Sequence, residues 1–127
     1  MKRRFRLTRS ADLKRVRHTG KSYAHPLVVL YVTVSNQEAT RVAVTAGRGT
    51  GNAVQRNRAK RLLRAAMADL LPGVRPGVDL LLIARSPLPR ADFLQAKQAL
   101  SGLFTRAGLF SPTANVRFER PATGLSE

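Results

Sequence analysis

The spacing of apolar residues along the chain predicts a mixture of helices and strands. Three segments repeat apolar residues three or four positions apart, as one face of a helix does; they are residues 10–17, 52 to about 71, and about 91–106. Three other segments are rich in Val, Leu, Ile and Tyr or alternate apolar with polar residues, as strands do; they are residues 22–34, 41–46 and 78–84. Pro26 has no N–H group, so it divides the first strand segment or places it near a sheet edge.

The predicted order of elements is α-β-β-β-α-β-α, which describes an α+β fold. A single sheet of about four strands, packed with helices, is the expected arrangement. Residues 1–110 are long enough to form this one domain around a real core. Residues 111–127 contain two prolines and little periodicity, so we predict a mobile C-terminal tail there.

Charge is distributed unevenly along the chain. There are 23 Lys and Arg residues against 7 Asp and Glu, a formal net charge of +16. Nine of the cations lie in residues 1–21 and five lie between Arg56 and Arg64, and Asp12 is the only acid in either segment. A solvated surface usually mixes both signs. Two single-sign segments predict a polyanionic partner, with nucleic acid first and a membrane surface second.

The helix predicted from residue 52 separates apolar residues from cations. Its apolar stripe should pack on the sheet and comprises Ala59, Leu62, Leu63, Ala66, Met67 and Leu70. Its outer face carries Arg56, Asn57, Arg58, Lys60, Arg61 and Arg64. These cations repel one another and lie in the half of the helix where the macrodipole disfavours positive charge. A bound polyanion relieves that repulsion, so we interpret this face as a binding surface rather than as a solvated one.

Residues suited to catalysis are scattered. The chain has no cysteine, and its two histidines, His18 and His25, have no motif partner. Acids occur singly, whereas a two-metal nuclease needs several convergent carboxylates; Asp12 and Asp92 each lie near a predicted helix start, where a capping role accounts for them. The glycine loop at 47–51 lacks the third glycine of the dinucleotide fingerprint and the GK[ST] of a phosphate-binding loop. The sequence therefore predicts a binding protein.

Tyr31 is an open case. It lies in an alternating strand on the same face as Val29 and Thr33. It is either an ordinary half-buried tyrosine or a platform on which a nucleic-acid base stacks, and the pattern favours neither.

The segment GNAVQRNRAKRLLR centres on Arg-Asn-Arg followed by Lys-Arg. In this it resembles the signature of the bacterial ribonuclease P protein family, and further motifs match that family in order. RLTRSADLKRVRHTGKSY resembles its N-terminal helix and following glycine, VVLY its early strand, and RVAVTAG and DLLLIAR the strands on either side of the signature. The resemblance covers roughly residues 5–110. It implies a small α+β domain with a left-handed β-α-β crossover around the signature helix.

The same resemblance implies a function. The protein would be the noncatalytic subunit of an endoribonuclease that removes the 5′ leader of precursor tRNA, with catalysis carried by an RNA subunit and its bound Mg²⁺. The protein itself is expected to bind no metal and no other cofactor. Its implied partners are the ribonuclease P RNA and precursor tRNA in the cytoplasm, with no membrane and no required protein oligomer.

Matched residue by residue, the resemblance implies two RNA-binding surfaces. The surface for the catalytic RNA comprises Arg48, Arg56, Asn57, Arg58, Lys60, Arg61 and Arg64. The surface for the single-stranded leader comprises Leu13, Arg17 and Tyr31. Leu13 and Arg17 stand where the family often has aromatic residues, so Arg17 would stack by its guanidinium plane or hold a phosphate. Gly49 stands where a second basic residue is common, which leaves Arg48 as the cation of that loop.

Two other classes of protein share these features. A noncatalytic ribosomal or RNA-chaperone protein would have the same charge and the same lack of an active site, and stimulation of leader removal by a partner RNA separates it from a ribonuclease P subunit. A basic membrane-surface protein would need an exposed apolar face beside its cations. The longest apolar runs, PLVVLYV and VDLLLIA, are too short to span a bilayer.

Overall fold

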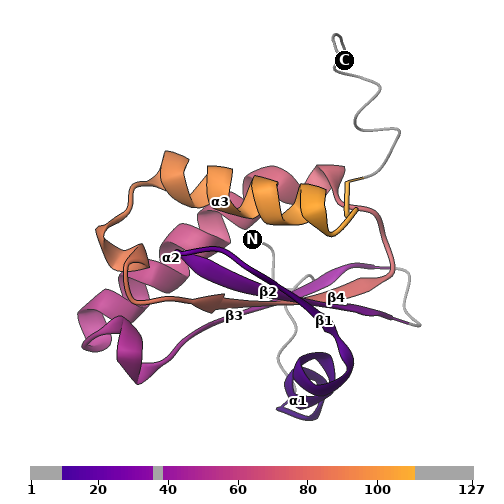
Figure 1. Ribbon diagram of the computed structural model, residues 1–127, viewed down its shortest axis with the longest axis horizontal. Coiled ribbons are helices and arrows are strands. Elements are labelled where there is room, and N and C mark those ends of the chain that lie inside the picture. Colours follow the sequence, from indigo (N-terminus) through magenta and orange to yellow (C-terminus); the bar gives the residue numbers. More distant parts are fainter. Residues whose placement is uncertain (1–9, 36–38, 111–127) are drawn as a thin grey trace, which may run out of the picture.

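The computed structural model describes residues 10–35 and 39–110 (Figure 1). The helices are α1 (Ser10–Thr19), α2 (Ala53–Leu70) and α3 (Phe93–Arg106), with short 3-10 turns η2 (Arg48–Thr50), η3 (Leu71–Gly73) and η4 (Leu88–Arg90). The strands are β1 (Lys21–Ala24), β2 (Val28–Val34), β3 (Arg41–Ala46) and β4 (Val78–Ala84). The predicted α+β class and element order are confirmed. The predicted tail, residues 111–127, lies outside the described residues.

The four strands form one sheet in the order β1-β2-β4-β3. The pairs β1–β2 and β2–β4 are antiparallel, whereas β3 and β4 are parallel and are connected through α2. Pro26 lies in the turn between β1 and β2, where His25 and Val28 exchange backbone hydrogen bonds of 2.9 and 3.2 Å. The predicted division at Pro26 is therefore correct. The β3-α2-β4 crossover also has the expected connectivity, and its left-handed sense stays a prediction.

The two faces of the sheet are covered by different helices. Figure 1 shows α2 and α3 on one face and α1 on the other. The α2/α3 face holds the larger core, with Leu30, Leu80, Leu82, Leu63 and Phe104 fully buried. The α1 face holds a small cluster of Val16, Ala43 and Leu81. Because side chains alternate along a strand, residues of β2 and β4 are divided between these two cores.

Helix α2 begins at a capping box. The side chain of Asn52 accepts a 3.0 Å hydrogen bond from the N–H of Gln55, and the Gln55 side chain accepts one of 3.0 Å from the N–H of Asn52. Asp92 and Gln95 form the same arrangement at the start of α3, which confirms the capping role predicted for Asp92. Each pair satisfies two backbone donors that the first turn of a helix leaves free.

Gly20 fixes the distance between α1 and the sheet. A Cβ atom at this position would lie 2.4 Å from the carbonyl oxygen of Val16 and 2.8 Å from that of Val32. The N–H of Gly20 donates to the Val16 carbonyl over 2.9 Å, so the helix ends in close contact with β2. Only glycine fits this approach, and α1 is thereby held beside the residues predicted to bind the leader.

Candidate nucleic-acid interface

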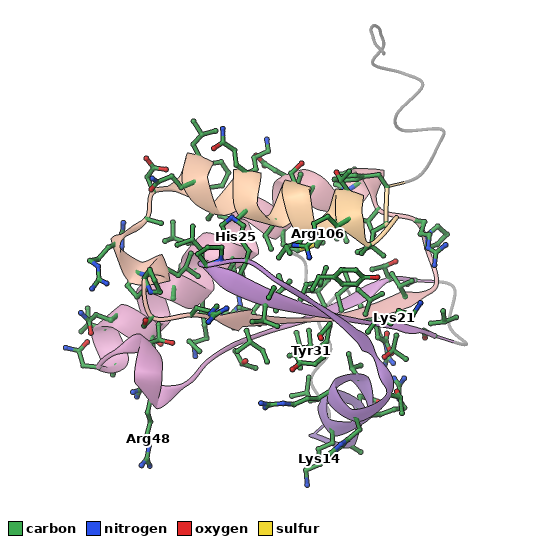
Figure 2. The ribbon with its side chains drawn as sticks, in the orientation of Figure 1. Lys14, Lys21, His25, Tyr31, Arg48 and Arg106 are labelled. Atoms are coloured by element: carbon green, nitrogen blue, oxygen red, sulfur yellow. The ribbon has the colours of Figure 1, made fainter. Side chains whose placement is uncertain are left out.

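The face of the sheet covered by α1 brings together two of the three residues predicted to bind the leader. Leu13 of α1 and Tyr31 of β2 are both half-buried and pack against the same small cluster, together with Ile83. Figure 2 shows Tyr31 on the α1 side of the sheet. Arg17 is exposed and lies one helical turn after Leu13, on the same face of α1.

A buried carboxylate anchors α1 to this face. Asp79 of β4 is 0% exposed, and its Oδ2 lies 2.5 Å from Nη2 of Arg15 in α1. Arg41 of β3 donates to the same carboxylate through two nitrogens, from Nε to Oδ1 over 3.1 Å and from Nη2 to Oδ2 over 3.0 Å. This hydrogen bonding raises the pKa of Arg41 above its ordinary value, so the guanidinium stays charged.

Asp12 extends the same network. Its carboxylate lies 3.7 Å from a guanidinium nitrogen of Arg15 and 3.7 Å from one of Arg41. Asp12 lies in the first turn of α1, as predicted, and it forms one ion pair within α1, with Arg15, and one between α1 and the sheet, with Arg41. Sequence reasoning missed Asp79, Arg15 and Arg41 as a group. The available signal was a single acid within the apolar strand VDLLLIA, because a buried charge of this kind needs a partner.

The face of α2 that packs on the sheet is as the sequence predicts. Ala59, Leu63, Ala66 and Met67 are buried, and Leu62 and Leu70 are half-buried. The cations of the signature and Asn57 lie outside this stripe, with Asn57, Arg58 and Arg61 exposed and Arg56, Lys60 and Arg64 half-buried. A polyanion can therefore reach this helix without disturbing the core.

Not all cations of α2 are equally available to a ligand. Arg58 donates from Nε to the carbonyl of Pro89 over 2.7 Å and from Nη2 to that of Ala91 over 3.3 Å, so it ties α2 to the segment before α3. Arg56 donates to the carbonyl of Gly51 over 3.0 Å. The side chains of Lys60, Arg61 and Arg64 make no hydrogen bond or ion pair within the described residues, and these three are the cations best placed to bind phosphates.

The loop before α2 carries Arg48 as an exposed cation, and Figure 2 shows its side chain pointing away from the sheet. Thr50 donates to the carbonyl of Ala84 over 3.3 Å, which holds this loop against the end of β4. Gly51 has φ +132°, and a Cβ there would lie 1.9 Å from the Gln55 carboxamide oxygen. A Cβ at Gly49 would meet no atom within 4 Å, so the missing basic residue at that position is not explained by lack of space.

The described part of the chain holds no group of three or more His, Cys, Asp or Glu residues that could bind a metal ion. None of its helices is long and apolar enough to cross a membrane.

Comparison with known proteins decides the family. The family model described as Ribonuclease P matches residues 1–108. The chain belongs to the ribonuclease P protein family. The ribonuclease P protein component of Oceanobacillus iheyensis is 34% identical over 116 residues, which cover 91% of this chain and 96% of that protein. The component of Chloroflexus aggregans is 38% identical over 112 residues, covering 87% of this chain and 83% of that protein.

Solved structures of this family have the same fold. The ribonuclease P protein of Staphylococcus aureus superposes with a TM-score of 0.75 at 28% identity, covering 84% of this chain and 98% of that one. The ribonuclease P protein of Thermotoga maritima superposes with a TM-score of 0.71 at 26% identity, covering 80% of this chain and 96% of that one. The resemblance drawn from the motifs is thus confirmed, and with it the role of a ribonuclease P protein subunit. Because the family is settled, the ribosomal and membrane-surface alternatives are set aside.

Proposed function

We propose that this protein joins two RNA segments within one ribonuclease P complex. The catalytic RNA is bound on the α2 side of the sheet, and the single-stranded 5′ leader of precursor tRNA is bound on the α1 side. The activity of the complex is hydrolysis of one phosphodiester bond, which releases the leader during tRNA maturation in the cytoplasm. The protein contributes binding and orientation of both RNAs.

The observation that carries the proposal is the separation of the two surfaces by the sheet. The unpaired cations of α2 lie on the layer that covers one face, whereas Leu13 and Tyr31 lie on the other. A ligand bound to the cations of α2 therefore leaves Leu13 and Tyr31 accessible, although Arg48 of the preceding loop points to the α1 side of the sheet (Figure 2). A protein with this arrangement can hold its RNA subunit permanently while substrates exchange on the opposite side.

Catalysis is assigned to the RNA subunit because the acids of the described residues already have structural partners. Asp12 and Asp79 belong to the network that anchors α1. Asp69 pairs with Lys97 over 3.3 Å, and Asp92 caps α3. These residues do not fit a resident metal ion, which needs several ligands at one point. Mg²⁺ is therefore expected to act in the complex through ligands of the RNA.

The leader surface is tested by comparing two ligands that differ only in the leader. Stacking of one base on an aromatic ring contributes about 1–3 kcal/mol. In the assembled complex, Tyr31→Ala should weaken binding of precursor tRNA about five-fold or more and leave the affinity for mature tRNA almost unchanged. Tyr31→Phe keeps the ring and serves as the matched control, with precursor affinity close to that of the unchanged protein. If Tyr31→Ala weakened both ligands equally, Tyr31 would serve the fold and not the leader.

A further inference from the structure

A groove lies at the end of the sheet where β2 begins and β4 ends. Its volume is about 440 Å³, and it is lined by Ala24, His25, Pro26, Arg85, Ser86 and Pro87. One wall is the turn between β1 and β2, and the other is the segment between β4 and η4. The N–H of Arg85 donates to the carbonyl of Leu27 over 3.0 Å, so the two walls are joined by a backbone hydrogen bond. A volume of this size accommodates a small ligand.

The groove is lined by hydrogen-bond donors. The Nδ1 atom of His25 accepts a 3.0 Å hydrogen bond from the N–H of Leu27, which in the neutral ring places the hydrogen on Nε2. The side chains of Arg85 and Ser86 are exposed. Arg85 has only a 3.5 Å contact with the carbonyl of His25, which leaves most of its donors free for an anion. The two prolines, Pro26 and Pro87, supply flat apolar surface beside these donors.

Positive charge around the groove is not balanced by acid. Arg106 of α3 donates to the carbonyl of Ala24 over 3.0 Å and lies over the ring of Tyr23 at 6.0 Å. Figure 2 shows His25 and Arg106 on the α3 side of the sheet, opposite Tyr31. Among the described residues, no Asp or Glu lines the groove. The groove thus combines hydrogen-bond donors, the guanidinium of Arg85 and apolar walls. These groups suit a nucleotide, whose phosphate is an anion and whose base has an apolar face.

Hydrogen bonds connect this groove to the signature helix. The segment that forms one wall continues to Pro89 and Ala91, whose carbonyls accept from Arg58 of α2. The carbonyl of Ala84, directly before Arg85, accepts from Thr50 in the loop that carries Arg48. The loop, the helix and the groove are therefore fixed relative to one another at one end of the sheet.

We infer that the groove binds one nucleotide of a single RNA strand, with the phosphate on Arg85 and the base against His25 and the prolines. The inference rests on the proposed function, because it extends the RNA-binding surface of α2 along the end of the sheet. The position on the α2/α3 side favours a strand of the catalytic RNA. A leader strand has the same chemistry, and the experiment distinguishes the two sources.

The first test measures affinity. The double variant His25→Ala, Arg85→Gln should bind the catalytic RNA roughly ten-fold more weakly, as expected from the loss of a charged hydrogen bond and a stacking contact. Arg75→Gln is the matched control, because Arg75 is also exposed but lies before β4, at the opposite end of that strand. It should change affinity about two-fold or less. Equal weakening by the two proteins would overturn the groove as a site and leave only a general effect of charge.

The second test locates the strand. The chain has no cysteine, so Ser86→Cys gives a single attachment point for a photoreactive aryl azide. In the complex with precursor tRNA, a cross-link to one unpaired nucleotide is expected, and the RNA that carries it identifies the source. Cross-links absent from both RNAs, or confined to base-paired helices, would overturn the inference. Leader removal by the same labelled complex tests the proposed function separately. A complex that removes the leader but gives no cross-link would refute the groove as a binding site and leave the proposed function intact.

Discussion

Asp79 should be among the residues most important for stability, although it is the one acid in an apolar strand. Its carboxylate is fully buried and contacts Arg15 at 2.5 Å and Arg41 at 3.0 and 3.1 Å. Asp79→Asn preserves the size of the side chain but removes the negative charge between two guanidinium groups. Removal of one partner from a buried ion pair costs about 3–5 kcal/mol, since the other charge is left buried without compensation.

The structure places the expected loss at the lower end of that range. Arg15 and Arg41 have 38% and 19% of their side chains exposed, so both can recover part of their hydration. Asp12 also remains within 3.7 Å of each of them. We therefore expect Asp79→Asn to lower the free energy of unfolding by about 3 kcal/mol.

The assay is urea denaturation of the free protein, with Asp69→Asn as the matched control. Asp69 also pairs with a cation, Lys97, but their side chains are 50% and 38% exposed. An exposed pair contributes about 1 kcal/mol or less. If both variants lost the same small amount of stability, the burial of Asp79 would not contribute to stability. The proposed role of Asp79 in anchoring α1 to the sheet would then be refuted.

Two further predictions concern α2 and the net charge. Arg61→Ala or Arg64→Ala should weaken assembly with the catalytic RNA by about 1 kcal/mol or more without loss of stability. Leu63→Ala should instead lower the free energy of unfolding by about 2–5 kcal/mol, because Leu63 is fully buried. Equal thermal destabilisation of all three variants would contradict the assigned faces of α2. If about six phosphates are neutralised, affinity for the catalytic RNA should fall several hundred-fold or more between about 50 and 200 mM monovalent salt, and a nearly flat salt response would exclude binding through phosphates.

The parts of the fold that sequence predicted are those determined by neighbouring residues. Helix and strand periodicity depends on residues a few positions apart, and the element order followed from it directly. The division at Pro26 also follows from the chemistry of one residue. The start of α2 was predicted to within one residue, because Asn52 caps the helix through a contact with Gln55 only three positions away.

The contacts that sequence did not predict join distant segments. Asp79 meets Arg41 across 38 positions and Arg15 across 64, so nothing in the local pattern connects them. The sequence placed Arg58 on a cationic helix face available to RNA. In the structure its guanidinium instead donates to backbone carbonyls more than thirty positions away. The groove at His25 could not be predicted for the same reason, because the pairing of β2 with β4 brings together two walls that are distant in sequence.

The residue-level roles of the two RNA surfaces came from the family motifs. Geometry adds that Leu13 and Tyr31 share one cluster, and that Lys60, Arg61 and Arg64 have no partner within the described residues.

A cleavage assay tests whether this protein assists an RNA catalyst. Purified, nuclease-free protein is incubated with precursor tRNA and Mg²⁺, alone and with the ribonuclease P RNA. We predict no cleavage by the protein alone. When the RNA subunit is added, we predict cleavage at the mature 5′ end, at a rate above that of the RNA subunit without protein. Cleavage by the protein alone, or no stimulation of the RNA subunit, would contradict this prediction.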